Sequence, residues 1–293
     1  MITRPLFASR PLFALATLTA LTAFPAIATA EDPDPELLRP HVRSMKVEDG
    51  RIVRVSIDSA DFQDPDWWGL LAKSEGLDAM QIKGAQSQDF ERISRIRSLR
   101  SLTFAGGRFT DEDMIPLREL EHLKTLHIHH NRGLNGDFLA ILPDLHDLEH
   151  LILHNIRPWK ASEMRHLAEV ESLESIHLTA LPVSVEDLEP LRGHENLSEV
   201  VFADDDFDGV VRFLATLPDL RDIELLRSEW KPIDDELVRL LASRENLHKI
   251  RSVNVAFTRD QVDLLQEALP DLELDMRKDD GGHTDSYPVE PEG

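Results

Sequence analysis

The sequence has no cysteine among its 293 residues, which excludes disulfide frameworks, thiolate metal sites, thiol nucleophiles and lipid anchors on cysteine. Positive charge is also scarce, because 32 Lys and Arg residues stand against 55 Asp and Glu, a net charge of −23. Nucleic acids and anionic membrane surfaces are bound by basic faces, so both are disfavoured as partners. The remaining composition, 41% hydrophobic and 30% charged, is typical of a soluble globular protein.

The one long apolar run lies at the N-terminus. Arg4 and Arg10 begin it, the stretch 11–25 is rich in Leu, Ala, Phe and Thr, and Ala28-Thr29-Ala30 has the small residues that a signal peptidase reads. Residues 1–30 are therefore predicted to be a cleaved secretory signal peptide, and the mature chain to be secreted or periplasmic. The run is shorter than the about 20 apolar residues that cross a bilayer, so no membrane span is expected after cleavage.

The rest of the chain repeats one apolar pattern. Each copy places apolar side chains at offsets 0, 3 and 5 from its first residue, as in Leu123, Leu126 and Ile128. Nine copies share this register, except that the last has Ser252 at its third position. They start at Ile52, Leu77, Leu99, Leu123, Leu148, Leu173, Leu197, Leu220 and Leu247. Such a period predicts one strand and one short helix per unit, stacked into a curved solenoid that shares a continuous core.

Two further features agree with this phase. A large apolar residue lies ten or eleven positions after most starts, and this column is predicted to be core rather than a ligand cage. It consists of Phe62, Phe109, Leu134, Trp159, Val183, Phe207, Trp230 and Phe257. Helix-capping patterns follow it, in which a Ser or Thr precedes an acid or amide by three residues. They are Thr110 with Asp113, Ser184 with Asp187, and Thr258 with Gln261.

With its L-x-x-L-x-L core repeated in phase over about residues 52–276, the sequence resembles the leucine-rich repeat family. The asparagine that the family carries after each strand is present as Asn131, whereas the equivalent positions hold Gly107, Ile156, Leu181 and Asp205, which leaves open how those turns are hydrogen-bonded. The resemblance implies an α/β horseshoe with a parallel β-sheet on the concave face and short helices on the convex face. It also implies a binding protein, with no enzymatic activity and no cofactor.

The sequence divides into four parts on this interpretation. After the signal peptide, residues 31–50 are predicted to be a polar tether and N-terminal cap, and residues 51–276 the leucine-rich repeat domain of about nine repeats. A last edge strand is expected at 272–276. Residues 277–293, rich in Gly, Pro, Asp and Glu, are predicted to be a disordered acidic tail.

Side chains at offsets 2, 4 and 6 of each strand are expected to project into the concave face, since alternate residues of a strand point to opposite sides. On three consecutive strands these positions hold five of the 13 histidines. The predicted binding residues are Thr125, His127, His129, His150, Ile152, His154, Ser175 and His177, followed on later strands by Glu199 and Glu224. Neighbouring strands lie about 4.8 Å apart, so the imidazoles are expected to be neighbours.

Three functions remain open for this face. A protein or other macromolecule could bind across it, and the acidic stretch at Glu199, Asp222 and Glu224 would attract a basic segment of that partner. The alternative is a metal-binding or pH-responsive protein, with His127, His129 and His154 as candidate metal ligands. A purely structural envelope component needs no specific site.

Other motifs that suggest chemistry are interpreted as structural. His146-Asp-Leu-Glu-His150 matches H-x-x-E-H, but its two histidines fall on a loop and a strand rather than on one helix. Asp204, Asp206, Asp208 and Gly209 resemble the opening of a calcium loop, yet the loop's glutamate is missing, and Asp208 is expected to cap the next helix. Asn196-Leu-Ser198 includes the start of a buried strand, so glycosylation is not expected. No catalytic motif is recognised, and the chain is predicted not to be an enzyme.

Overall fold

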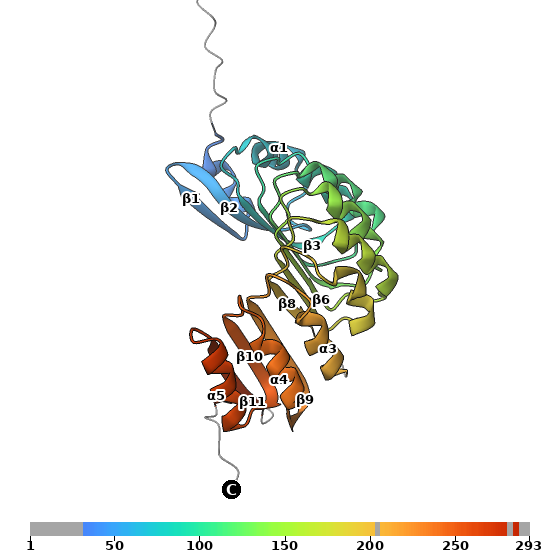
Figure 1. The fold of residues 1–293 in the computed structure, drawn as a ribbon. Helices are drawn as coiled ribbons and strands as arrows, with labels where there is room; N and C mark the ends of the chain where they lie inside the picture. Colours follow the sequence, from blue (N-terminus) through green and yellow to red (C-terminus); the bar gives the residue numbers. More distant parts are fainter. Residues whose placement is uncertain (1–31, 203–205, 280–283, 287–293) are drawn as a thin grey trace, which may run out of the picture. The chain divides into compact units, whose positions relative to one another are not determined.

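A computed structural model describes residues 32–202, 206–279 and 284–286, and the predicted signal peptide lies outside the described residues. Twelve strands form one sheet and are ordered in it as they are in the chain (Figure 1). They are β1 Ser44–Glu48, β2 Arg51–Asp58, β3 Ala79–Ala85, β4 Ser101–Gly107, β5 Thr125–Asn131, β6 His150–His154, β7 Ser175–Thr179, β8 Glu199–Phe202, β9 Asp222–Pro232, β10 Lys249–Ala256, β11 Glu273–Asp279 and β12 Thr284–Ser286.

Short helical segments alternate with the strands and form a second layer beside the sheet (Figure 1). Those in the middle of the chain are 3-10 helices, labelled η. The segments are η1 Pro35–Leu37, η2 Arg39–His41, α1 Pro65–Lys73, α2 Ser87–Ile93, η3 Glu112–Glu119, η4 Asp137–Asp144, η5 Ala161–Glu169, η6 Val185–Leu191, α3 Phe207–Leu214, α4 Asp235–Ala242 and α5 Arg259–Ala268. In the part of the chain that the structure describes, no helix has the length and apolar character to cross a bilayer.

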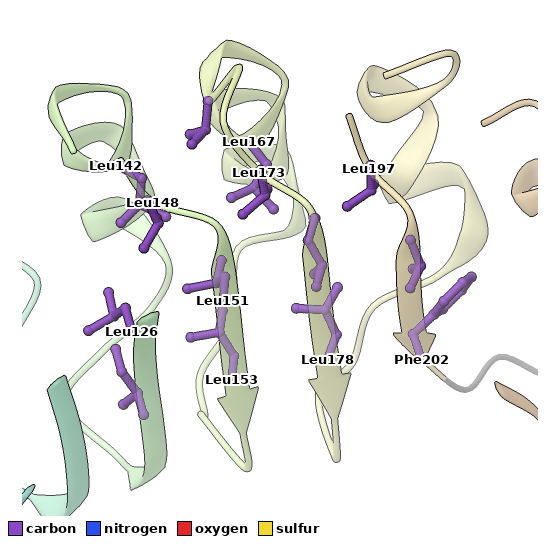
Figure 2. Close-up of a cluster of buried hydrophobic side chains, with 14 of the residues drawn as sticks. Leu126, Leu142, Leu148, Leu151, Leu153, Leu167, Leu173, Leu178, Leu197 and Phe202 are labelled. Carbon is purple, nitrogen blue, oxygen red and sulfur yellow. The ribbon is translucent and has the colours of Figure 1, made fainter. Parts of the chain in front are cut away.

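The nine predicted copies each form a strand, β2 to β10, and these strands pair in parallel. Their patterned side chains are completely buried, as at Leu126, Leu151 and Leu153, and they pack against Leu142 and Leu167 of the helical layer (Figure 2). Burying each such side chain stabilises the fold by about 1.5–3 kcal/mol. The predicted stack of strand–helix units around one core is confirmed.

The second apolar column also lies in the core, with one exception. Phe62, Phe109 and Leu134 are fully buried, and most of the others nearly so. Trp230 is 42% exposed, so the prediction that it belongs to the core is wrong. Strand β9 extends through this residue to Pro232, and Ile233, three positions later, is the buried one. In this longer unit, Ile233 rather than Trp230 contributes its side chain to the core.

The chain turns through a left-handed residue at offset 7 of most repeats. These residues are Gly84, Gly106, His130, Asn155, Ala180 and Asn254, with φ between 52° and 76°. The turn interrupts the strand alternation, so that the side chains of His130, Asn155 and Ala180 are at least partly exposed, and the residue after His130, Asn131, is buried. There the Asn131 Oδ1 accepts the N–H groups of Gly133 (2.6 Å) and Leu134 (2.8 Å). In the following repeat, where Ile156 replaces the asparagine, the backbone instead bonds to the preceding turn, from Arg157 N–H to the Asn131 carbonyl.

Replacing Ala180 with glycine is expected to stabilise the protein by about 0.5–1 kcal/mol. Ala180 is exposed at φ 53°, where the Cβ of an L-residue is crowded and glycine is not. The matched control is Ala168→Gly, at an exposed position of η5, which is expected to destabilise by a similar amount because it only adds backbone entropy. Urea denaturation measures both, and a loss of stability in Ala180→Gly would contradict the strain at this turn.

An antiparallel strand pairs with the parallel strands at each of the two edges of the sheet. Within the predicted tether and cap, β1 pairs antiparallel with β2, and Leu38 is buried in the core. At the other end the expected edge strand is β11, but β12 pairs antiparallel along its outer side. Residues 277–279 and 284–286 of the predicted disordered tail are therefore in strands, and the rest of that tail lies outside the described residues.

Candidate functional site

The side of the sheet that faces away from the helices, here called the open face, carries the predicted binding residues. The strand register places His127 beside Ile152 and Ile152 beside His177, and it places His129 beside His154. The third row runs through Thr125, His150, Ser175 and Glu199 and continues at Asp222 on β9; Glu224 lies two residues further along that strand. The sequence thus predicted which side chains share this face. Ser175 is the member that solvent barely reaches, at 5% exposed.

Four imidazoles of β5 and β6 lie in contact on this face; we call His127, His129, His130 and His154 the histidine quartet. The ring centres of His127 and His129 are 3.8 Å apart, and those of His129 and His154 are 5.6 Å apart. The ring of His130 lies 4.9 Å from that of His154. The prediction from offsets 2, 4 and 6 did not include His130, which is at offset 7, where the left-handed turn at φ 53° directs its side chain outward. Gly84, Gly106 and Asn155, at the same offset of other repeats, are the sequence signal that could have indicated this turn.

Two rings of the quartet are held through their Nδ1 atoms. The His154 Nδ1 lies 2.8 Å from the Thr179 hydroxyl on β7. The His130 Nδ1 lies 2.8 Å from the side-chain amide nitrogen of Asn155, at the equivalent turn of the next repeat. Side chains of adjacent repeats therefore orient these imidazoles, and the quartet is a product of the stacking rather than of one strand.

Burial and neighbouring imidazoles disfavour protonation of two members of the quartet, His127 and His129. Burial, followed by the neighbouring His129, His154 and His177, lowers the pKa of His127 from 6.5 to about 4. The pKa of His129 is also lowered, first by burial and then by His154 and His130. Both of these side chains are therefore uncharged at neutral pH.

The carboxylates on the later strands of the open face, Glu199 on β8 and Glu224 on β9, are already engaged by neighbouring side chains. The Glu199 Oε2 lies 3.2 Å from the His177 Nε2 and accepts the Ser175 hydroxyl at 2.9 Å. The contact with His177 is the main cause of the lowered pKa of Glu199, and burial opposes it. Glu224 pairs with Arg251 at 3.4 Å. These two carboxylates therefore attract a basic segment of a partner less strongly than the sequence suggested, because each already has a partner within the chain.

Comparison of the sequence alone finds no matching protein-family model and no matching curated protein. Comparison of the coordinates finds TLR13, in its complex with ssRNA13, with a TM-score of 0.51 and 15% identity over 76% of this chain. The fold is a leucine-rich repeat solenoid. The chain spans about a third (32%) of the TLR13 chain, so the likeness concerns the repeat architecture alone.

Two leucine-rich repeat proteins of Listeria monocytogenes are also similar. The internalin InlF matches with a TM-score of 0.44 and 14% identity, over 72% of this chain and 65% of its own. The internalin C2 matches with a TM-score of 0.43 and 20% identity, over 68% of this chain and 78% of its own.

The metal hypothesis finds no support in this geometry. Among the residues that the structure describes, no group of three or more His, Cys, Asp or Glu side chains lies in an arrangement that could hold a metal ion. The candidate ligands His127, His129 and His154 are close together, but their rings contact one another rather than converge on one point.

The other chemical motifs are part of the leucine-rich repeat framework. His146 lies between η4 and β6, and His150 begins β6, so the helical arrangement of a metalloprotease is not formed. Asp204 lies outside the described residues. The expected cap of α3 is wrong by two positions, because Asp206, not Asp208, is the N-cap and accepts the Gly209 N–H at 3.0 Å. Asp208 follows in the first turn, where its charge favours the positive helix end.

Proposed function

We propose that this chain is an exported, non-enzymatic leucine-rich repeat protein of bacterial secreted type that binds a protein through its open face, with β5 to β7 at the centre. The observation that carries this proposal is the alignment of half-buried polar and aromatic side chains across adjacent strands. Half-buried imidazole, hydroxyl and aliphatic groups offer contact area and hydrogen bonds without a large desolvation penalty. The helical layer packs its apolar side chains against the sheet.

Export rests on the sequence of residues 1–30, with its basic start, apolar run and Ala28-Thr29-Ala30. Secreted or periplasmic localisation follows from the same residues. A protein partner is favoured over a nucleic acid because the net charge of −23 would repel phosphates, although TLR13 is known in a complex with ssRNA13. A basic segment of the partner would lie over Asp222 and Glu199, beside the centre of the face.

Replacing Ile152 with aspartate is expected to weaken partner binding by about tenfold or more. Ile152 lies between His127 and His177, so a charge there would be desolvated at the centre of the interface. The matched control is Ile115→Asp, at a 44% exposed position of η3 in the helical layer, which is expected to leave binding unchanged.

The wild-type mature chain is first used to capture its partner from extracytoplasmic extract. The captured partner is then cross-linked to the chain to locate the interface. The dissociation constants of the purified partner for the three proteins are then compared at pH 7.5. Melting curves establish that both variants are folded. Equal binding by wild type and Ile152→Asp, or cross-links confined to the helical layer, would contradict the proposal.

A further inference from the structure

The histidine quartet differs from the other paired histidines of this protein in having no acidic partner. His122 lies 3.0 Å from Asp147, His166 lies 3.4 Å from Glu163, and His177 lies 3.2 Å from Glu199. No ion pair joins His127, His129, His130 or His154 to a carboxylate of any described residue. The chain has 55 acidic residues. A cluster of imidazoles that has no carboxylate paired with it among the described residues is therefore a distinct chemical environment.

Each element around the quartet contributes few charges to it. On β4, the side chains beside it are Thr103 and Ala105, which are uncharged. The β6 strand adds His150, and β7 adds His177, which disfavours charge on His127. The acidic Glu199 of β8 acts on His177 and His150. Lys124 and Glu149 pair with each other just before β5 and β6 begin.

A protonated quartet therefore needs an anion from outside the chain. We propose that the histidine quartet docks a carboxylate-bearing segment of the protein partner, and that docking takes up protons. This inference deepens the proposed function and rests on it, since it names the chemistry that the open face recognises. Charge complementarity carries it: the rings of His129, His130 and His154 are partly or fully exposed, lie in one cluster, and have no carboxylate of their own among the described residues.

Proton linkage gives the direction of the effect. In the free protein, burial and mutual repulsion hold the pKa of His127 and of His129 low. A docked carboxylate favours the imidazolium form and raises these pKa values, so the complex binds more protons than the free protein. Affinity must then increase as the pH falls from neutral. A basic segment at the same place would show the opposite dependence, because it would be repelled.

The test uses a hexaglutamate peptide as the probe and the mature chain as the receptor. Calorimetry at pH 7.5 and pH 5.5 gives the affinity, and repetition in buffers of different ionisation enthalpy gives the number of protons taken up. Glutamate carboxyls, with a pKa near 4.3, are still ionised at pH 5.5. The expected result is a gain in affinity of about tenfold or more at pH 5.5, with net proton uptake, and a weaker interaction of hexalysine at that pH than at pH 7.5.

Two triple variants distinguish a gain in affinity caused by the quartet from one caused by the general loss of negative charge on acidification. The test variant is His129→Gln/His130→Asn/His154→Gln, in which asparagine suits the left-handed turn. The control variant is His122→Gln/His146→Asn/His166→Gln, which removes the same number of imidazoles outside the open face. The test variant is expected to lose the pH-dependent gain, and the control to keep it.

Two results would overturn the inference: no binding of hexaglutamate by the wild type at pH 5.5, or an equal gain in both triple variants. Neither would by itself overturn the proposed function, which depends on the Ile152→Asp comparison at pH 7.5. Conversely, a quartet that binds hexaglutamate while Ile152→Asp leaves partner binding intact would support the anion site and reject the open face as the main interface.

Discussion

Truncation of Phe104 to alanine is expected to destabilise the protein by about 4 kcal/mol, within the range for large core aromatics. Phe104 of β4 is fully buried, and its ring centre lies 5.1 Å from those of both Phe90 and Phe109. The Phe90 and Phe109 rings are 4.8 Å apart, so three aromatic side chains from β4, α2 and the turn after β4 fill one space. Alanine leaves a cavity that its neighbours, fixed by the backbone of adjacent repeats, fill only in part.

Urea denaturation followed by circular dichroism measures this loss. Phe104→Leu is the matched control, and because it keeps most of the apolar volume it is expected to cost about 1–1.5 kcal/mol. Since each repeat contacts mainly its neighbours, unfolding of the variant is expected to begin around β4. Hydrogen exchange should then show the fastest opening near Phe104. A cost below about 1 kcal/mol for the alanine variant would contradict the tight packing of these rings.

The second large effect is expected for Asp111→Ala, with a loss of about 3 kcal/mol. The Asp111 carboxylate is 9% exposed and accepts three backbone N–H groups of the next repeat, from Asn135 (3.0 Å), Gly136 (3.1 Å) and Phe138 (2.9 Å). Hydrogen bonds to a charged group contribute about 1.5–3 kcal/mol each, and unsatisfied buried donors are costly. The substitution removes the acceptor and leaves all three donors without it.

Asp113→Ala provides the comparison for this residue. Asp113 lies two residues later, in the first turn of η3, and is partly exposed to water; its carboxylate accepts the backbone N–H of Thr110 (2.7 Å) and the side-chain hydroxyl of Ser87 in the preceding repeat (3.0 Å). Its removal is expected to cost about 1 kcal/mol, as for the loss of a helix cap. Chemical denaturation of the two variants side by side measures the difference, and equal costs would contradict the larger contribution of the three buried backbone hydrogen bonds to Asp111.

The sequence was sufficient to predict the strands because their buried positions repeat with an invariant spacing. Leu126 and Leu151 mark the same place in consecutive units, and alternation then places His129 and His154 side by side. These inferences use only the period and the strand geometry. They succeed because the paired strands from β2 to β8 keep one register.

The remaining features of the structure depend on contacts that the repeat pattern of the sequence does not specify. His130 faces outward because of a backbone angle that its own side chain does not favour, and Trp230 is exposed because its unit is longer than the others. The partners of Asp111 lie 24 to 27 residues away, at the start of η4 in the next repeat. Which histidines lack a carboxylate is likewise a matter of three-dimensional neighbours, so the quartet and its partner chemistry required the coordinates.

The antiparallel strands β1 and β12 also constrain how such a molecule can evolve. A new unit appended before Ile52 would have to displace β1 from its pairing with β2, and one appended after β11 would have to displace β12. Internal duplication meets no such obstacle, because any pair of parallel strands between β3 and β8 can separate and receive an identical module. Growth or shortening of this array in related genes is therefore expected from the interior, with both termini retained.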